Sequence, residues 1–378
     1  MMLSEVERLN LNNVSSRMPQ HGGKSWKKIG FHSGKKTSKV RFVPSKTKHD
    51  NDVGVFLSAT YEEEKNELCM WSVDPMAQFE ESGEKLNLKC SLNCEFDCVD
   101  MKISDSGRVF LCWSDGSCGM FTVYPTLQPS FTWQNLHRSG GQLHCACRGV
   151  DVMGEDVVTV GDDGKLILLN SYNQTPVKSI DASSVGLTSV CFSKHNEVVT
   201  GNSRGQIAFW DLRNEGGKPT GVLCLSRLRG EKTVHPTANS LEKHPTRTHL
   251  LLSGGSDGCV TLWDLRNAKF PVEFERTHTG PVLEAHFHPE MQECIVSCSS
   301  SGDAFLWDCS LPSTPSTFNP VANDQDAWSS VGRAHHPQVT TLLPKVTETS
   351  VTSLALSHNM IVCSKDPGFL FVYKKQLN

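Results

Sequence analysis

Hydrophobic and polar residues alternate along most of the chain, and the alternation restarts after each of several glycine-containing turns. A large apolar or aromatic residue follows each turn by five positions, as from Gly205 to Trp210 and from Gly258 to Trp263. Glycine supplies the positive φ of a tight hairpin turn, and a period of two is typical of a half-buried β-strand. Seven copies can be read, with anchor residues Trp71, Phe121, Leu169, Trp210, Trp263, Trp307 and Tyr373.

Further apolar runs precede these turns, such as 187–192 and 197–200 in the fourth copy. Three strands are therefore legible in a repeat, and a fourth fits into each connecting segment. The anchors are spaced by 41 to 66 residues, which matches the roughly 40–45 residues of a four-stranded propeller blade if some blades carry insertions. We expect surface-loop insertions at about 214–243 and 310–337, and we predict an all-β, seven-bladed WD40-type β-propeller.

The two ends of the repeat array predict how the propeller closes. The chain ends five residues after Tyr373, which leaves no room for an outer strand, whereas an extended segment at 26–32 precedes the first repeat. We expect this N-terminal strand to complete the seventh blade and remove the open edge, with 39–43 as the innermost strand of the first blade. Residues 1–24 are predicted to be a disordered leader and residues 25–378 a single propeller.

Composition and charge narrow the class of protein. Hydrophobic residues make up 38% and charged residues 21%, and the net charge is −4, which is typical of a globular chain that has no overall attraction to nucleic acid or anionic lipid. No run approaches the ~20 apolar residues of a membrane span, and the first residues lack the apolar run of a signal peptide. We therefore expect a protein that is neither membrane-inserted nor secreted.

The basic residues are unevenly distributed. Eleven lysines and arginines and no acid occur from Arg8 to His49, so the rest of the chain carries a charge of −15. The lysines at 24, 27, 28, 35, 36 and 39 have two interpretations. They form a nuclear-localisation or nucleic-acid contact, or they are a solvated strand edge where lysine discourages edge pairing. We favour the second and predict no specific nucleic-acid partner.

Cysteine and histidine were the candidates for metal ligands. The fifteen cysteines are an odd number, often within apolar runs, which fits a reducing compartment. Zinc ligation by Cys90, Cys94 and Cys98, or by His144–Cys147, lacks the paired spacing of zinc knuckles. His286 and His288 share a strand face, but a histidine next to Pro289 is typical of a strand end that faces solvent. We predict reduced thiols, no metal and no cofactor.

Catalytic chemistry has no support in the sequence. There is no phosphate-binding loop, no zinc-protease helix and no nucleophile elbow, so we predict a non-enzyme without catalytic residues. In the fifth blade, Ser253, Asp257 and Trp263 are expected to form a hydrogen-bonded group that fixes the turn. Arg204 and Ser301 stand where blades four and six should carry the corresponding aspartate.

A Trp-Asp pair after an Asp-Gly turn is the WD40 signature. The order of 38–44, 158–164, 254–266, 284–289 and 341–344 resembles the family of forty-three-kilodalton WD-repeat nucleoporins of the nuclear pore Y-complex. The resemblance runs from about residue 26 to the C-terminus, while the leader and the loop 310–337 depart from the family pattern.

This resemblance implies a role, which composition and spacing do not. It implies a non-catalytic scaffold in the outer ring of the nuclear pore complex, bound to an α-solenoid nucleoporin of the Y-complex short arm and to other Y-complex subunits. It also implies location at the nuclear envelope, service to mRNA and protein transport, and kinetochore function in mitosis. The alternative comes from Trp210–Arg213 and Trp263–Arg266, which resemble the WDxR element of WD40 substrate receptors for cullin ubiquitin ligases.

Overall fold

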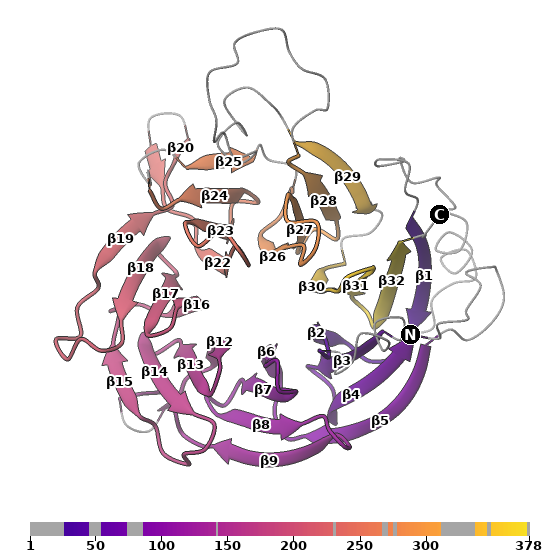
Figure 1. Cartoon of the computed structure of the whole chain (residues 1–378), viewed down its shortest axis with the longest axis horizontal. Helices are drawn as coiled ribbons and strands as arrows, with labels where there is room; N and C mark the ends of the chain where they lie inside the picture. Colours follow the sequence, from indigo (N-terminus) through magenta and orange to yellow (C-terminus); the bar gives the residue numbers. More distant parts are fainter. Residues whose placement is uncertain are drawn as a thin grey trace, which may run out of the picture.

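The computed structural model describes residues 26–44, 54–73, 86–140, 143–229, 232–266, 271–274, 278–310, 337–345 and 349–375. Their strands form seven four-stranded antiparallel sheets, which stand as blades in a ring (Figure 1). Within this part of the chain there is no helix, and therefore no helix that is long and apolar enough to cross a membrane. The predicted all-β, seven-bladed propeller is confirmed.

Each blade runs from an innermost to an outermost strand. Blades one and two contain β2 (Thr37–Phe42), β3 (Val55–Thr60), β4 (Asn66–Val73), β5 (Leu86–Cys94), then β6 (Cys98–Ile103), β7 (Arg108–Trp113), β8 (Cys118–Thr122) and β9 (Gln128–Trp133). Blades three and four contain β12 (Cys147–Met153), β13 (Asp156–Gly161), β14 (Lys165–Asn170), β15 (Lys178–Asp181), then β16 (Leu187–Lys194), β17 (Glu197–Asn202), β18 (Gln206–Asp211) and β19 (Gly221–Cys224).

Blades five and six contain β22 (Ala238–Lys243), β23 (Leu250–Gly255), β24 (Val260–Asp264), β25 (Val272–Phe274), then β26 (Val282–Phe287), β27 (Cys294–Ser299), β28 (Ala304–Asp308) and β29 (Gln338–Leu343). Blade seven contains β30 (Val351–Leu356), β31 (Met360–Lys365), β32 (Phe369–Lys375) and, on its outside, β1 (Trp26–His32). All seven anchor residues of the sequence pattern lie on the third strand of their blade.

Blade seven is composed of both ends of the described chain. Strand β1 pairs with β32 along its full length, from Trp26 opposite Lys375 to His32 opposite Phe369. Trp26 is buried in the core shared by blades six and seven, against residues such as Phe371 and Tyr373. Closure by the N-terminal strand is therefore confirmed, and β2 is the innermost strand of blade one as predicted (Figure 1).

The glycine turns set both the hairpin geometry and the distance between blades. Six of the turn glycines have φ between 71° and 92°, a region that L-residues rarely adopt. A Cβ at Gly258 would also collide with the carbonyl oxygen of His278, in the segment that leads into blade six. In blade one the degenerate copy works differently, because β4 begins at Asn66 and the positive φ before it belongs to Glu62.

The second strand of each blade is buried on both faces, rather than on one as the alternation predicts. All six residues of β23, β27 and β31 are buried. The reason is that each blade packs between two neighbours, so both faces of its central strands meet apolar side chains. Seven clusters of buried residues result, and clusters such as that of Val158, Val190 and Trp210 span neighbouring blades.

The predicted insertions fall differently. In the range 214–243 the structure has the outer strand β19, the innermost strand β22, and between them a short hairpin of β20 (Arg227–Arg229) and β21 (Lys232–Val234). Only the hairpin is additional to the blade pattern. A second hairpin, β10 (Arg138–Ser139) with β11 (Leu143–His144), precedes blade three. The predicted loop 310–337 lies almost wholly outside the described residues, as does the predicted leader 1–24.

Candidate functional site

The innermost strands of five blades carry a cluster of charged side chains at the centre of the ring, which we call the axial cluster. Innermost strands alternate between core-facing and axial positions, so polar residues two apart share one side. The members are Lys39 and Arg41 on β2, Asp100 and Lys102 on β6, Asp151 on β12, Glu242 on β22, and Glu284 and His286 on β26.

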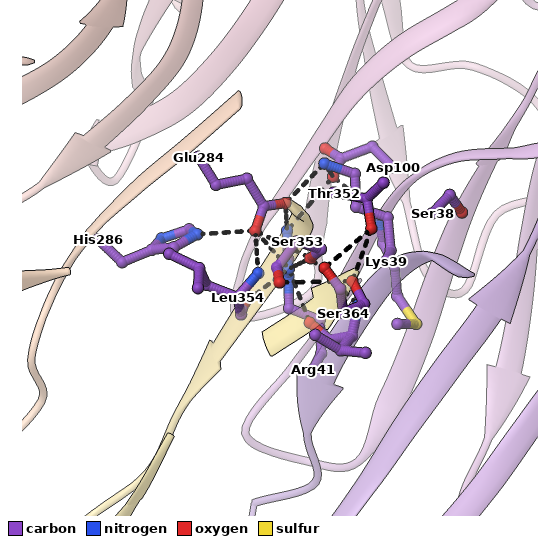
Figure 2. A network of polar contacts seen from close by, with 12 residues as sticks. Ser38, Lys39, Arg41, Asp100, Glu284, His286, Thr352, Ser353, Leu354 and Ser364 are labelled. Carbon is purple, nitrogen blue, oxygen red and sulfur yellow. Dashed lines mark hydrogen bonds and ion pairs between the residues drawn. The ribbon is translucent and has the colours of Figure 1, made fainter. Parts of the chain in front are cut away.

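Glu284 lies at the middle of this cluster, with its side chain 4% exposed. One carboxylate oxygen accepts from Lys39 Nζ at 2.6 Å and Arg41 Nη2 at 2.9 Å. The other accepts from the backbone N–H of Leu354 at 2.7 Å and the Ser353 hydroxyl at 2.9 Å. Figure 2 shows these partners converging on one carboxylate, which thereby joins blade six to blades seven and one.

Other carboxylates in the cluster repeat this link between neighbouring blades. Asp100 accepts from the N–H of Val150 at 3.0 Å, and Asp151 accepts from that of Phe192 at 2.7 Å. Glu242 accepts from the N–H of Phe287 at 2.9 Å. Each bond runs from an acid on one innermost strand to the backbone of the next. A buried carboxylate is stable only with such partners, so the acids both need and enforce the spacing of the blades.

Charges within the axial cluster compensate each other. Burial would raise the pKa of Glu284, but Arg41, Lys39 and His286 hold it well below its usual value. Burial would lower the pKa of His286, but Glu242 and Glu284 outweigh it and raise that pKa to about 9. His286 is therefore protonated at neutral pH, and four cations face four carboxylates. With its charges and carboxylates engaged internally, the cluster is suited to holding the ring together rather than to acid–base chemistry.

The tryptophan anchors form the second polar feature. The indole N–H donates to a hydroxyl on the neighbouring second strand in four blades, at 2.8 or 2.9 Å, in the pairs Trp71–Ser58, Trp210–Thr200, Trp263–Ser253 and Trp307–Ser297. In blade six the chain of bonds is complete, because His278 joins Ser297 at 2.8 Å to Asp303 at 2.6 Å. Blade three has the same histidine and aspartate, His137 and Asp163, at 2.9 Å.

These bonds correct the prediction for the turn aspartates. In blade five Ser253 and Trp263 pair as expected, but Asp257 forms an ion pair with Arg227 at 3.1 Å instead of with a histidine. In blade six the aspartate is present two positions after Ser301, as Asp303, because it follows the turn glycine instead of preceding it. Sequence reasoning missed His137 and His278, whose only signal is a histidine 26 or 25 residues before the aspartate.

Both Trp-Asp-Leu-Arg elements fold back on themselves. Arg213 makes paired bonds to Asp211 at 2.9 and 2.7 Å, and Arg266 makes paired bonds to Asp264 at 3.0 and 2.7 Å. Each aspartate also accepts the backbone N–H of its arginine, which closes the turn after the third strand. The two arginines remain exposed at the ends of adjacent blades. Recognition of a ubiquitin-ligase adaptor by these elements stays a prediction.

The residues considered as metal ligands lie on different strands and differ in burial. All fifteen cysteines are free; Cys90 and Cys94 lie on the outer strand β5, whereas Cys98 is buried on β6. His144 is exposed on β11, and Cys147 is buried on β12. Among the described residues, no three His, Cys, Asp or Glu gather as a metal site would require. The absence of metal and cofactor stays a prediction.

His288 corrects the expectation that it faces solvent. Its side chain is fully buried, and its Nδ1 accepts the backbone N–H groups of Glu290 and Met291 at 3.2 and 3.1 Å. The turn after Pro289 therefore folds over the imidazole of His288. Burial, with Lys375 and His358 nearby, lowers the pKa of His288 to about 4, so it is neutral. His286 lies in the axial cluster, and the two histidines share no partner.

Several described lysines of the basic N-terminal region are paired with acids. Lys35 meets Glu67 and Lys36 meets Glu62, each at 2.7 Å. Lys39 binds Glu284, and Lys28 lies 4.4 Å from the centre of the Phe371 ring. This pairing supports the strand-edge interpretation over a nucleic-acid surface; Lys24 lies outside the described residues.

Seven four-stranded blades, a closing N-terminal strand and anchors with Trp-Asp pairs define a WD-repeat β-propeller protein. Residues 144–323 match a family model for the β-propeller of nucleolar protein 10-like N-terminal domains. Over nearly its whole length the chain resembles nucleoporin Nup43. It is 27% identical to the human protein over 370 residues, which are 89% of this chain and 96% of the relative.

Two further relatives agree. The mouse Nup43 is 27% identical over 373 residues, 90% of this chain and 96% of that protein. The nuclear pore complex protein nup43 of Dictyostelium discoideum is 33% identical over 150 residues, 39% of this chain and 33% of that one. The predicted resemblance to the WD-repeat nucleoporins is confirmed.

Proposed function

We propose that this protein is a non-enzymatic scaffold subunit of the nuclear pore complex, within the Y-complex of the outer ring. The observation that carries the proposal is the similarity to proteins named as nucleoporins over about nine-tenths of the chain. That similarity supports a nuclear pore role for this chain. The assignment to the Y-complex, the location at the nuclear envelope and the kinetochore role in mitosis rest on the family resemblance.

The fold supports a scaffold because it is closed and internally satisfied. Strand β1 seals the rim, and the axial cluster links neighbouring blades at the centre. A rigid disc of this kind presents loops and outer strands that can vary without disturbing the core. We propose that an α-solenoid nucleoporin of the Y-complex short arm binds this surface. Stable attachment requires about 1,200–2,000 Å² of buried area in total, which one face or part of the rim can supply.

The polar clusters support a structural role over catalysis. Glu284 and His286 are engaged with cations and acids of the protein itself. Asp303, His278 and Ser297 form a relay that ends on Trp307 and not on a reacting group. On this basis we propose that the contribution to mRNA and protein transport is made through binding surfaces alone.

The test uses the full chain carrying a fluorescent affinity tag at its normal expression level. We expect a nuclear-rim pattern in interphase and recovery of Y-complex subunits in quantitative mass spectrometry. The variant Arg213→Ala/Arg266→Ala should keep the core intact, since both arginines are exposed and each pairs with the aspartate two positions before it. It should retain the rim pattern and the same partners. A diffuse pattern, with a cullin adaptor that is recovered with the wild type and lost with this variant, contradicts the scaffold and supports the ligase receptor.

A further inference from the structure

A second group of reactive side chains is buried between blades two and three, away from the axial cluster. Cys112 on β7, Cys118 on β8 and Cys147 on β12 belong to one buried cluster. The Sγ atoms of Cys147 and Cys112 are 2.7 Å apart. The covalent S–S bond of a disulfide is about 2.05 Å, so these two thiols need little movement to become bonded.

His137 polarises this pair. Its Nδ1 is 2.9 Å from Asp163 and its Nε2 is 3.1 Å from the Thr159 hydroxyl, and Cys147 is near enough to raise the pKa of the ring. Gly161 lies against the ring, where any Cβ would collide with it. Asp163 therefore holds the imidazole by a hydrogen bond, and Gly161 leaves free the space that the ring occupies.

The charges follow from this arrangement. Burial would lower the pKa of His137, but Cys147 and Asp163 raise it to about 9. Burial would raise the pKa of Cys147, but the hydrogen bond from Cys112 and the charge of His137 lower it to about 6. The two groups thus favour the thiolate of Cys147 beside an imidazolium, and the thiolate is the nucleophilic form of cysteine.

We propose that Cys147 and Cys112 are a redox-active pair that hydrogen peroxide converts into a disulfide joining blades two and three. The Cys147 thiolate attacks one oxygen of the peroxide, so that an S–O bond forms and the O–O bond breaks. The released hydroxide takes a proton from His137 and leaves as water. The Cys112 sulfur then attacks Sγ of the Cys147 sulfenic acid, the S–O bond breaks, and the second hydroxide leaves with the Cys112 proton as water. Two thiols are oxidised and one peroxide is reduced to two waters.

The same fold supplies a matched thiol that lacks these features. Cys298 is the fifth residue of β27, as Cys112 is of β7, and it is also buried at a boundary between blades. The innermost strand of the next blade begins there with Val351 in place of Cys147. Burial raises the pKa of Cys298 well above its usual value. Cys298 should therefore stay a thiol under conditions that oxidise the Cys112–Cys147 pair.

Peroxide reaches the pair through local opening, because both sulfurs are fully buried. Before Cys147 in the chain lie the two-residue strands β10 and β11, in which Arg138 is half-buried and Ser139 and His144 are exposed. Short hairpins at a blade edge belong to the least stable part of a fold and open more readily than its core strands.

The experiment treats the full chain, fully reduced, with hydrogen peroxide at neutral pH, and blocks the remaining thiols with an alkylating reagent. Non-reducing peptide mapping should find Cys112 linked to Cys147, with loss of two hydrogens and reversal by a dithiol reductant. Cys298→Ser should leave this product unchanged, and Cys147→Ser should abolish it. Oxidation that leaves the pair reduced while exposed Cys224 reacts, or a Cys112–Cys118 link in its place, overturns the proposal.

Rate measurements keep the proposal testable if Cys147→Ser folds poorly. In the wild type, the rate of disulfide formation should fall about tenfold from pH 7 to pH 5, as the thiolate is protonated near pH 6. His137→Gln should slow the reaction at pH 7 by about tenfold or more, because the pKa of Cys147 returns towards that of an ordinary thiol. A rate that is unchanged across this pH range, or in His137→Gln with an unchanged melting temperature, also refutes it.

Discussion

Replacing Glu284 with glutamine removes one charge from the centre of the ring while keeping the side chain's shape. Lys39 and Arg41 then lose their closest acid, and the new amide N–H₂ faces cations where the carboxylate accepted hydrogen bonds. Removing one partner of a buried ion pair costs about 3–5 kcal/mol, a large share of the 5–15 kcal/mol that typically holds a domain folded.

The expected change in melting temperature follows from chain length. An unfolding entropy of about 2.1 cal/mol/K per residue over 378 residues amounts to roughly 0.8 kcal/mol/K, so the loss corresponds to roughly 4–6 °C. Circular dichroism or scanning calorimetry measures it at neutral pH, with Glu197→Gln as the control. Glu197 pairs with Lys194 at 3.3 Å on the surface, and exposed pairs contribute less than about 1 kcal/mol.

Two outcomes show whether the axial cluster contributes to the stability of the fold. The combined Lys39→Gln/Glu284→Gln protein should lose less stability than the two single losses together, because each removes the same interaction. A melting temperature for Glu284→Gln within about 1 °C of the wild type, equal to that of Glu197→Gln, would refute the reasoning that the axial cluster holds the blades together.

Three further predictions concern closure, pH and the turns. Deleting residues 1–24 should leave the melting temperature nearly unchanged. Deleting residues 1–34 removes β1 and should lower the melting temperature sharply or abolish soluble expression. Equal behaviour of the two truncations in expression and melting assays contradicts closure by β1. His286 has a folded pKa raised to about 9, above that of the unfolded chain near 6.5. Its contribution, up to roughly 3 kcal/mol, is complete below about pH 6.5 and lost as pH rises through 9. Denaturant midpoints should therefore fall more steeply from pH 7 to 10 in the wild type than in His286→Gln. Gly258→Ala forces a side chain into φ 82° against His278 and should cost at least about 1–3 kcal/mol by the same midpoints, while Gly154→Ala, with open space around it, should cost less.

The blade architecture was predictable because its signals are local. A turn glycine and an apolar residue five positions later occur within one hairpin, so Gly205 with Trp210 or Gly302 with Trp307 can be found without any knowledge of the fold. Closure was predictable by counting, because the seventh repeat shows three strands up to its anchor Tyr373 and the segment 26–32 supplies a fourth. These inferences depend on hydrogen bonding and turn geometry within short segments.

The axial cluster was not predictable, because its members come from strands that are far apart in the chain. Lys39 and Glu284 are separated by 245 residues, and each reads as an ordinary polar position of an alternating strand. The turn aspartate of blade six was misplaced for a different reason. Asp303 reaches His278 from the position after the glycine, and the pattern looked only before it. The burial of His288 was not predictable, because nothing in the sequence shows that the backbone N–H groups after Pro289 donate to its imidazole.

The composite seventh blade has a consequence for synthesis on the ribosome. Strand β1 is made before every other described strand, yet its pairing partner β32 is made after all the others, and His32 and Pro367 are separated by 335 residues where they meet. Until the other strands of blade seven have been made, β1 has no sheet to join and blade one has no neighbour on that side. Since domains fold as units and unpaired strand edges promote aggregation, the nascent chain must be kept from pairing with other chains while it waits. Ring closure is therefore a late event that has to wait for the synthesis of β32.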